Sequence, residues 1–203
     1  MNTKDKKALD HYVSNTKKEV NNTLKNLDEA ALNKAATLIR KSVKNGGRVH
    51  VSGIGKPGHI AGYISSLMSS TGTPSYFLHG TEAVHGSSGQ LRKGDVVIFI
   101  SNSGETEEMK ATVETILNNE CDVIGVSGNK DSWLAKKSKV HLLAHVDEEG
   151  GPLNRAPRAS ILSETIVMQA LSTILQAGAN VDPKQYVKWH PGGSLGKLRD
   201  NEK

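Results

Sequence analysis

The spacing of hydrophobic positions changes along the chain near residue 46. From about Asp5 to Asn45 these positions recur at helical intervals, which predicts one or two long amphipathic helices ending at Asn45-Gly46-Gly47. Beyond residue 47, short apolar runs without clean polar alternation predict strands that are buried on both faces. The runs are Arg48–Ser52, Ser75–Leu78, Val96–Ile100, Asp122–Val126 and Val140–Ala144. The chain therefore divides into a helical extension, residues 1–46, and a domain, residues 47–203.

Helical patterns separate the predicted strands. They cover Gly58–Ser70, Glu107–Asn118, Ser132–Lys136 and Ser160–Gln176. Alternation of strands and helices predicts an α/β fold with a parallel sheet, and ligands in such folds bind beyond the carboxyl ends of the strands. The segment Asp147–Pro157 has no periodicity and is rich in Glu, Gly and Pro, so we interpret it as a functional loop. We also expect irregular structure beyond Asp182.

A hydroxyl-rich turn follows the predicted strand Val96–Ile100 and opens a helix. Ser101, Ser103 and Thr106 supply hydroxyl groups, Gly104 allows close backbone approach, and the unpaired N–H groups of the helix start point to the same place. A helix cap alone would need only Thr106. The turn therefore favours a phosphate cradle.

A second turn, Gly53-Ile54-Gly55-Lys56-Pro57-Gly58, follows the predicted strand Arg48–Ser52 and also opens a helix. In a parallel sheet the carboxyl ends of strands lie at one edge. The two turns together indicate a binding site for a small phosphorylated molecule.

Composition and charge narrow the classes of function. Cys121 is the single cysteine, so no intrachain disulfide can form, and a reducing cytoplasm is expected. The charged N-terminal start and the lack of long apolar stretches predict no membrane association. The net charge is +5, but basic residues are interspersed with acidic ones and aromatic residues make up 4%, which argues against nucleic-acid binding.

Several separated stretches resemble one protein family. They are Gly53-Ile54-Gly55-Lys56-Pro57-Gly58-His59, Ser70-Thr71-Gly72-Thr73-Pro74, Glu82-Ala83-Val84-His85-Gly86, Ile100-Ser101-Asn102-Ser103-Gly104-Glu105, Pro152-Leu153 with Ala156-Pro157, and His190-Pro191-Gly192-Gly193-Ser194-Leu195-Gly196. In joint order and spacing they resemble the sugar isomerase (SIS) domain, and within it the arabinose-5-phosphate isomerases. The resemblance covers about Arg48 to Leu198.

The resemblance implies a fold, a reaction and an assembly. The fold is a three-layer αβα sandwich with a five-stranded parallel sheet of flavodoxin-like topology. The implied activity is aldose-ketose isomerisation of a sugar phosphate, D-ribulose 5-phosphate to D-arabinose 5-phosphate, through an enediol and without a cofactor, in a homodimer or homotetramer. Family members often carry paired CBS domains after the isomerase domain, and we expect this chain to lack them.

The resemblance also assigns individual residues. The catalytic candidates are Lys56, Glu108, Glu149 and His190, and the substrate-binding candidates are Ser52, Gly53, His85, Ser101, Asn102, Ser103 and Thr106. Isomerisation needs a base for a carbon-bound proton, groups that stabilise the enediol oxygens, and a proton shuttle, and these residue types supply all three. Each candidate also has a purely structural alternative: a solvated first-turn acid for Glu108, part of a hydrated acidic run for Glu149, an exposed turn residue for Lys56 and an ordinary turn residue for His190.

The remaining histidines are possible metal ligands. His79, Glu82 and His85 form the tightest cluster, but their spacing is not a recognised zinc pattern and no cysteine lies nearby, so we predict no metal. His50, His141 and His145 lie on or beside predicted strands and are interpreted as framework residues.

Two departures from the family pattern keep alternative functions open. Pro57 stands where the family has Ser, and the Ser/Thr-rich segment after Ala156-Pro157 is thinned to Arg158-Ala159-Ser160-Ile161-Leu162-Ser163. A non-catalytic phosphosugar sensor is therefore the alternative hypothesis. A sugar-responsive transcription regulator is disfavoured, because the pattern of the first 45 or so residues predicts long helices rather than a helix-turn-helix domain. We expect those helices to contact a partner subunit.

Overall fold

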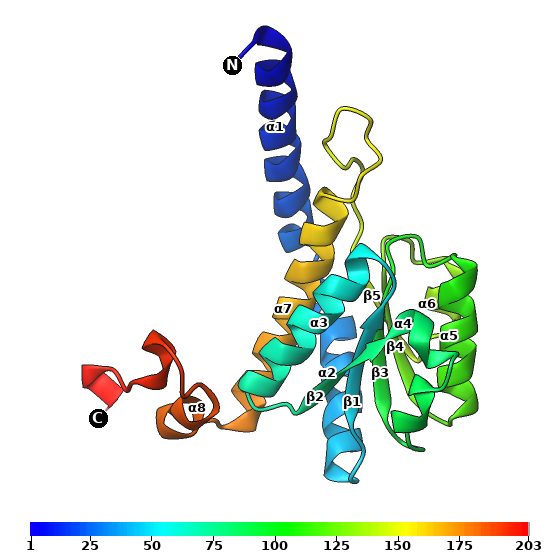
Figure 1. Cartoon of the computed structure of the whole chain (residues 1–203), viewed down its shortest axis with the longest axis vertical. Coiled ribbons are helices and arrows are strands. Elements are labelled where there is room, and N and C mark those ends of the chain that lie inside the picture. The colour runs from blue at the N-terminus through cyan, green and yellow to red at the C-terminus, as the bar shows by residue number, and fades with distance from the viewer. Residues whose placement is uncertain (203) are drawn as a thin grey trace.

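The computed structural model describes residues 1–202 and contains one five-stranded sheet between helical layers (Figure 1). The strands are β1 (Val49–Gly53), β2 (Ser75–His79), β3 (Val96–Ile100), β4 (Asp122–Ser127) and β5 (Val140–Leu143). All neighbours are parallel and the order is β2-β1-β3-β4-β5. The order reverses between β1 and β3, and a doubly wound sheet places its ligand at such a switch point. The predicted fold class is confirmed.

Two apolar clusters hold the helices on opposite faces of the sheet. On one face lie α2 (Glu29–Lys44), α3 (Lys56–Ser70) and α7 (Ala159–Ala179), and on the other α4 (Gly80–Ala83), α5 (Glu107–Asn118) and α6 (Trp133–Lys137) (Figure 1). Within β3, Val96, Ile98 and Ile100 join the first cluster, whereas Val97 and Phe99 join the second. A strand covered on both faces needs apolar residues at every position, which is the pattern seen in the sequence.

The N-terminal extension forms two helices, α1 (Thr3–Lys25) and α2. They separate at Asn26, and Asp28 starts the second helix because its side chain accepts the Ala31 N–H at 2.9 Å. Helix α1 packs against α7, where Thr23 Oγ1 donates to Ser163 Oγ at 3.0 Å, and its first turns project past the domain (Figure 1). The extension is therefore joined to the domain by the apolar residues of α2 and by a buried polar contact of α1.

The expectation of irregular structure beyond Asp182 is wrong in part. Residues Pro183–Trp189 form helix α8, followed by single turns of 3-10 helix at Ser194–Gly196 and Asp200–Glu202. Asp182 caps α8 by accepting the Gln185 N–H at 2.7 Å, and Pro183 occupies the first turn. That aspartate-proline pair is a start signal that could have been found in the sequence. A further 3-10 turn covers Ser87–Gln90.

Among residues 1–202, no helix is long and apolar enough to cross a membrane.

Candidate functional site

The two turns singled out in the sequence meet at the carboxyl edge of the sheet. Gly53, the last residue of β1, lies opposite Ile100, the last residue of β3. A β-carbon on Gly53 would lie 3.0 Å from the Ile100 carbonyl oxygen and 2.9 Å from the Pro57 carbonyl carbon. Only glycine allows strand β1, the start of α3 and strand β3 to come this close. The predicted juxtaposition of the two turns is therefore present.

The serine turn, Ser101–Thr106, is held from the side of β4 and α6. The Ser101 N–H donates to the Val126 carbonyl at 3.0 Å, and the Asn102 carbonyl accepts the Gly128 N–H at 2.8 Å. Glu105 Oε1 accepts the Trp133 N–H at 2.8 Å. The turn is thus fixed before any ligand arrives, which reduces the entropy lost on binding.

Donors in the serine turn are left open toward solvent. Thr106 stands at the N-cap of α5, but its side chain makes no capping bond, and the first intrahelical bond runs from the Lys110 N–H to the Thr106 carbonyl. The N–H groups of Glu107, Glu108 and Met109 therefore have no partner within the helix. Ser103 is exposed. Hydroxyls and first-turn N–H groups at the positive end of a helix dipole form a site for a phosphate group.

The glycine turn adds a cation and a pocket. Gly55 has φ +65°, and Lys56 is the exposed first residue of α3. A pocket of about 290 Å³ lies beside it, lined by Gly53, Ile54, Gly55, Gly58, His59, Phe77, His79 and Thr81. Lys56 is thus an exposed cation that directly follows Gly55, one of the residues that line the hollow.

Two further candidates lie inside the same edge of the sheet. Ser52 is 0% exposed and its Oγ has no hydrogen-bond partner. Asn102 is half-buried within the serine turn. A buried hydroxyl without a partner is unusual, because burying a polar group unpaired carries a cost. Its presence at the end of β1 fits a group that finds its partner in a bound molecule.

Glu108 and His85 come from adjacent helical segments. Glu108 is exposed in the first turn of α5. Thr112 Oγ1 donates to the Gly80 carbonyl at 2.6 Å and so ties α5 to α4, which precedes His85. In the described part of the chain, no group of three or more His, Cys, Asp or Glu side chains is arranged to hold a metal ion, and this includes His79, Glu82 and His85. His79 instead caps α4.

Glu149 lies in the loop before α7 and holds the start of that helix. Its Oε2 accepts the N–H groups of Arg158 at 2.6 Å and Ser160 at 3.1 Å. Arg158 is the N-cap residue and makes no side-chain capping bond, so Glu149 supplies the cap from outside the helix. The segment predicted as a functional loop thus places a half-buried carboxylate at the carboxyl edge of the sheet.

Within one chain, His190 lies away from the other candidate residues. It ends α8, where its Nδ1 lies 2.9 Å from the Tyr186 carbonyl oxygen and its ring stacks on Tyr186 at 4.0 Å. The chain leading into α8 passes the opposite edge of the sheet, because a β-carbon on Gly72 would lie 2.5 Å from Val181 Cγ2. Figure 1 shows α8 beyond the end of α7 that lies away from the serine turn.

The framework histidines have protein partners. His50 Nε2 lies 3.2 Å from Asp95 Oδ2, and His141 Nε2 lies 2.9 Å from Ser127 Oγ. His145 contacts the Gly128 carbonyl through Nδ1 at 2.9 Å.

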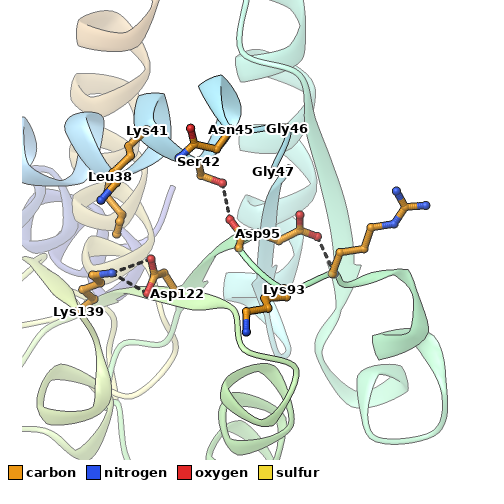
Figure 2. Close-up of a pocket in the computed structure, with 12 residues that line it drawn as sticks. Leu38, Lys41, Ser42, Asn45, Gly46, Gly47, Lys93, Asp95, Asp122 and Lys139 are labelled. Carbon is orange, nitrogen blue, oxygen red and sulfur yellow. Dashed lines mark hydrogen bonds and ion pairs between the residues drawn. The ribbon is translucent and has the colours of Figure 1, made fainter.

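A second hollow, of about 270 Å³, lies at the amino edge of the sheet (Figure 2). Its charged groups are mostly paired: Lys139 Nζ donates to both carboxylate oxygens of Asp122, at 2.9 and 2.8 Å. Asp95 on its wall accepts the N–H groups of Arg48 and Arg92. These pairs close the loops before β3, β4 and β5, so the hollow of Figure 2 is a structural feature rather than part of the candidate site.

The chain is similar to a known protein family, to curated proteins and to solved structures. The SIS domain family matches residues 43–174. Arabinose 5-phosphate isomerase KdsD of Francisella tularensis is 37% identical over 174 residues, which are 86% of this chain and 53% of that protein. KdsD of Pseudomonas aeruginosa is 40% identical over 151 residues, 74% of this chain and 46% of that protein. The structure of Escherichia coli CFT073 c3406 in complex with arabinose 5-phosphate has a TM-score of 0.81 and 34% identity, and the match covers 94% of this chain and 100% of that one.

The fold is a doubly wound parallel sheet with the serine turn and the glycine turn at its switch point. The chain belongs to the SIS domain family. It spans about half the length of the KdsD proteins it matches.

Proposed function

We propose that this chain is an aldose-ketose isomerase that interconverts D-ribulose 5-phosphate and D-arabinose 5-phosphate. The observation that carries the proposal is the pair of adjoining turns, with open hydroxyl and N–H donors beside the exposed Lys56. The similarity to KdsD and to a protein solved with arabinose 5-phosphate supports the choice of substrate. The phosphate binds at Ser101, Ser103, Thr106 and the first turn of α5, and the sugar lies toward Gly53, Ser52, Asn102 and His85.

The reaction needs only proton transfers. A base takes a proton from C1 of the ketose while the C2 carbonyl oxygen gains one, which gives the enediol. A proton then returns to C2 while the C1 hydroxyl loses its own, which gives the aldose. Glu108 and Glu149 are the proposed acid and base groups, Lys56 stabilises negative charge that develops on oxygen, and His190 moves protons between oxygens.

His190 acts from a second copy of the chain in this proposal. Within one chain α8 starts at the amino edge of the sheet, whereas the serine turn lies at the carboxyl edge. A homodimer or homotetramer supplies the missing histidine and covers α1, where Leu9, Tyr12 and Val13 are exposed at helical spacing. Residues 1–46 thus serve as an oligomer contact and residues 47–203 as the isomerase domain.

We propose that the protein works in the reducing cytoplasm, because Cys121 is its single cysteine and no intrachain disulfide can form. Cys121 is buried and burial chiefly raises the pKa of its thiol to about 11, which makes it a packing residue and not a reactive one.

The experiment is to incubate the purified protein with D-ribulose 5-phosphate and follow the appearance of D-arabinose 5-phosphate by nuclear magnetic resonance. Glu108→Gln is expected to lower kcat by at least a hundredfold, in the range of general acid-base catalysis. Glu107→Gln is the matched control, because Glu107 is the neighbouring residue, 85% exposed and paired with Lys110 at 2.9 Å. Equal activity of the two variants would remove Glu108 from the chemistry.

The alternative function is a phosphosugar sensor that binds without turnover. Pro57 motivates it, because proline in the first turn of α3 offers no backbone donor to a ligand. Calorimetric binding of arabinose 5-phosphate without conversion of any pentose or hexose phosphate would favour the sensor.

A further inference from the structure

Glu164 is a carboxyl group in the interior of the domain that the proposed reaction does not use. It is 0% exposed, and neither of its side-chain oxygens has a hydrogen-bond partner. An ionised carboxylate is strongly disfavoured in such a place, so the group holds a proton. Burial, with a smaller effect from the charge of Glu149, raises the pKa of Glu164 from 4.5 to about 8. Glu164 is therefore neutral at pH 7.

The position of Glu164 on α7 links it to Glu149. It lies four residues beyond Ser160, and residues four apart share one face of a helix. Ser160 is buried, donates its N–H to Glu149 Oε2 and has an Oγ without a partner. One face of α7 thus carries both the anchor of Glu149 and a protonated carboxyl one turn further on.

Further charged groups lie on the helices that pack against α7. On α1, Glu19 accepts the Asp147 N–H at 3.1 Å, and Lys18 lies 3.3 Å from its second oxygen. On α2, Arg40 donates to the Ile174 carbonyl, near the far end of α7. On α3, the first turn carries Lys56 and His59. The charge that adds to the effect of burial and raises the pKa of Glu164 is that of Glu149.

We propose that Glu164 is a positioning residue for Glu149, which it serves by staying neutral. With Glu164 uncharged, the Glu149 carboxylate sits against the N–H groups of Arg158 and Ser160. Once Glu164 ionises, its charge and that of Glu149 repel each other across the protein interior, and Glu149 leaves its place. This inference rests on the proposed function, in which Glu149 takes part in proton transfer. It gives the isomerase an upper pH limit set by a residue that does not touch the sugar.

The first test measures stability and is independent of activity. The folded state binds a proton that the unfolded state releases at pH 4.5, so the stability from this proton is complete below that pH and is lost as the pH rises through about 8. Urea unfolding is measured from pH 4.5 to 8 for the wild type and Glu164→Gln. The ratio of the unfolding constant of the wild type to that of the variant is expected to rise about tenfold per pH unit. Glu114→Gln makes the same change at an exposed position of α5 and should give a constant ratio.

The second test measures the link to Glu149. The same pair of unfolding series is repeated in a Glu149→Gln background. Without the like charge of Glu149, the pKa of Glu164 should be lower. The ratio of unfolding constants should therefore stop rising at a lower pH than in the wild-type background. An unchanged upper end would show that the two carboxyl groups do not interact and would overturn the proposal.

The third test uses the pH dependence of kcat/KM. The wild type should lose activity above about pH 8, and Glu164→Gln, which cannot ionise, should keep its activity to higher pH. Alkaline limbs at the same pH in both proteins would overturn the positioning role. If the wild type has no isomerase activity at any pH, the proposed function fails, but the two unfolding tests still decide whether the pair exists.

A second variant covers the case in which Glu164→Gln does not fold. Glu164→Met keeps a side chain of similar length and removes both carboxyl oxygens. Infrared spectra of the wild type at pH 7 should show the carbonyl band of a protonated carboxyl that disappears in Glu164→Met. A wild-type spectrum without that band would mean that Glu164 is ionised and would overturn the proposal.

Discussion

A β-carbon added to Gly104 would lie 2.6 Å from the Oγ of Ser132 and 2.7 Å from its Cβ. Ser132 cannot yield easily, because its Oγ caps α6 by accepting the Ala135 N–H and contacts Ser127 Oγ at 3.0 Å. Gly104 also has φ +65°, a region that L-residues rarely adopt. The shape of the serine turn therefore depends on the absence of a side chain at one position.

Gly104→Ala should lower stability by about 1–3 kcal/mol, since strain and contact add at the same residue. It should also weaken sugar-phosphate binding, because the turn that carries Ser103 is displaced. Urea unfolding and calorimetric titration with arabinose 5-phosphate measure the two effects. Gly62→Ala on α3 is the control, since a β-carbon there meets nothing within 4 Å. Equal stability of the two variants would contradict the strain argument.

Ser103→Ala should weaken binding of the sugar phosphate roughly 10- to 150-fold with little change in stability. The side chain is exposed and accepts the Glu105 N–H at a long 3.3 Å, so folding gains little from it, whereas a hydroxyl bound to a phosphate is worth about 1.5–3 kcal/mol. Calorimetric titration gives the dissociation constant. Ser66→Ala, at an exposed position of α3, serves as control. Unchanged affinity in Ser103→Ala would place the phosphate elsewhere.

Asp95→Asn should destabilise the domain by about 3–5 kcal/mol near pH 7. Asp95 is 1% exposed and accepts the N–H groups of Arg48 at 2.8 Å and Arg92 at 2.9 Å, beside the Arg48 guanidinium at 2.8 Å. Burial opposes ionisation, but these donors outweigh it and lower the pKa of Asp95 from 3.8.

The pH dependence of Asp95 has a defined sign. Because the folded-state pKa is depressed, the stability from this group is present above pH 3.8 and is lost as the pH falls through the lower folded-state value. Urea unfolding of the wild type and Asp95→Asn should therefore converge below pH 3.8. A difference that stays constant down to low pH would mean that the charge of Asp95 is not what stabilises the loops.

Mixing of inactive variants should restore activity if His190 comes from a second copy. His190→Ala and Glu108→Gln are each expected to be inactive. Random reassembly of a dimer with shared sites gives about a quarter of the wild-type activity, because half of the dimers are mixed and each of these has one intact site. Unmixed variants treated identically are the control. No recovery, in a protein shown by sedimentation to exchange subunits, would place His190 in its own chain's site.

The central strands β1 and β3 could be predicted because every position in them is buried. The expectation of burial on both faces is wrong for the edge strands β2 and β5, which keep exposed positions because each has a neighbouring strand on one side only. In β3, five consecutive apolar residues show neither the spacing of an amphipathic helix nor the alternation of a half-exposed strand. Where such runs alternate with helical segments along the chain, they indicate a parallel sheet. The position of the serine turn could be predicted for the same reason, since Ser101 directly follows the last residue of the buried strand β3. Helix α8 was missed because its few apolar residues are flanked by Pro and Gly, although Asp182-Pro183 marks its start.

The candidate site was harder to predict, because the burial of a residue and its position relative to the sheet depend on how the elements pack. In the sequence, Glu164 stands between the polar residues Ser163 and Thr165, and its burial follows only from the packing of α7 against α1, α2 and α3. His190 was grouped with Glu108 and Lys56 by resemblance. A sequence does not say that α8 starts at the other edge of the sheet.

Glu149 has two roles that cannot be separated. The carboxylate proposed to exchange a proton with the sugar is also the cap that two amides of the α7 start share. Each protonation removes the charge from that cap, so the proposed reaction would loosen and re-form the first turn of α7 once per cycle. Amide hydrogen exchange at Ser160 would then report catalysis from inside the protein.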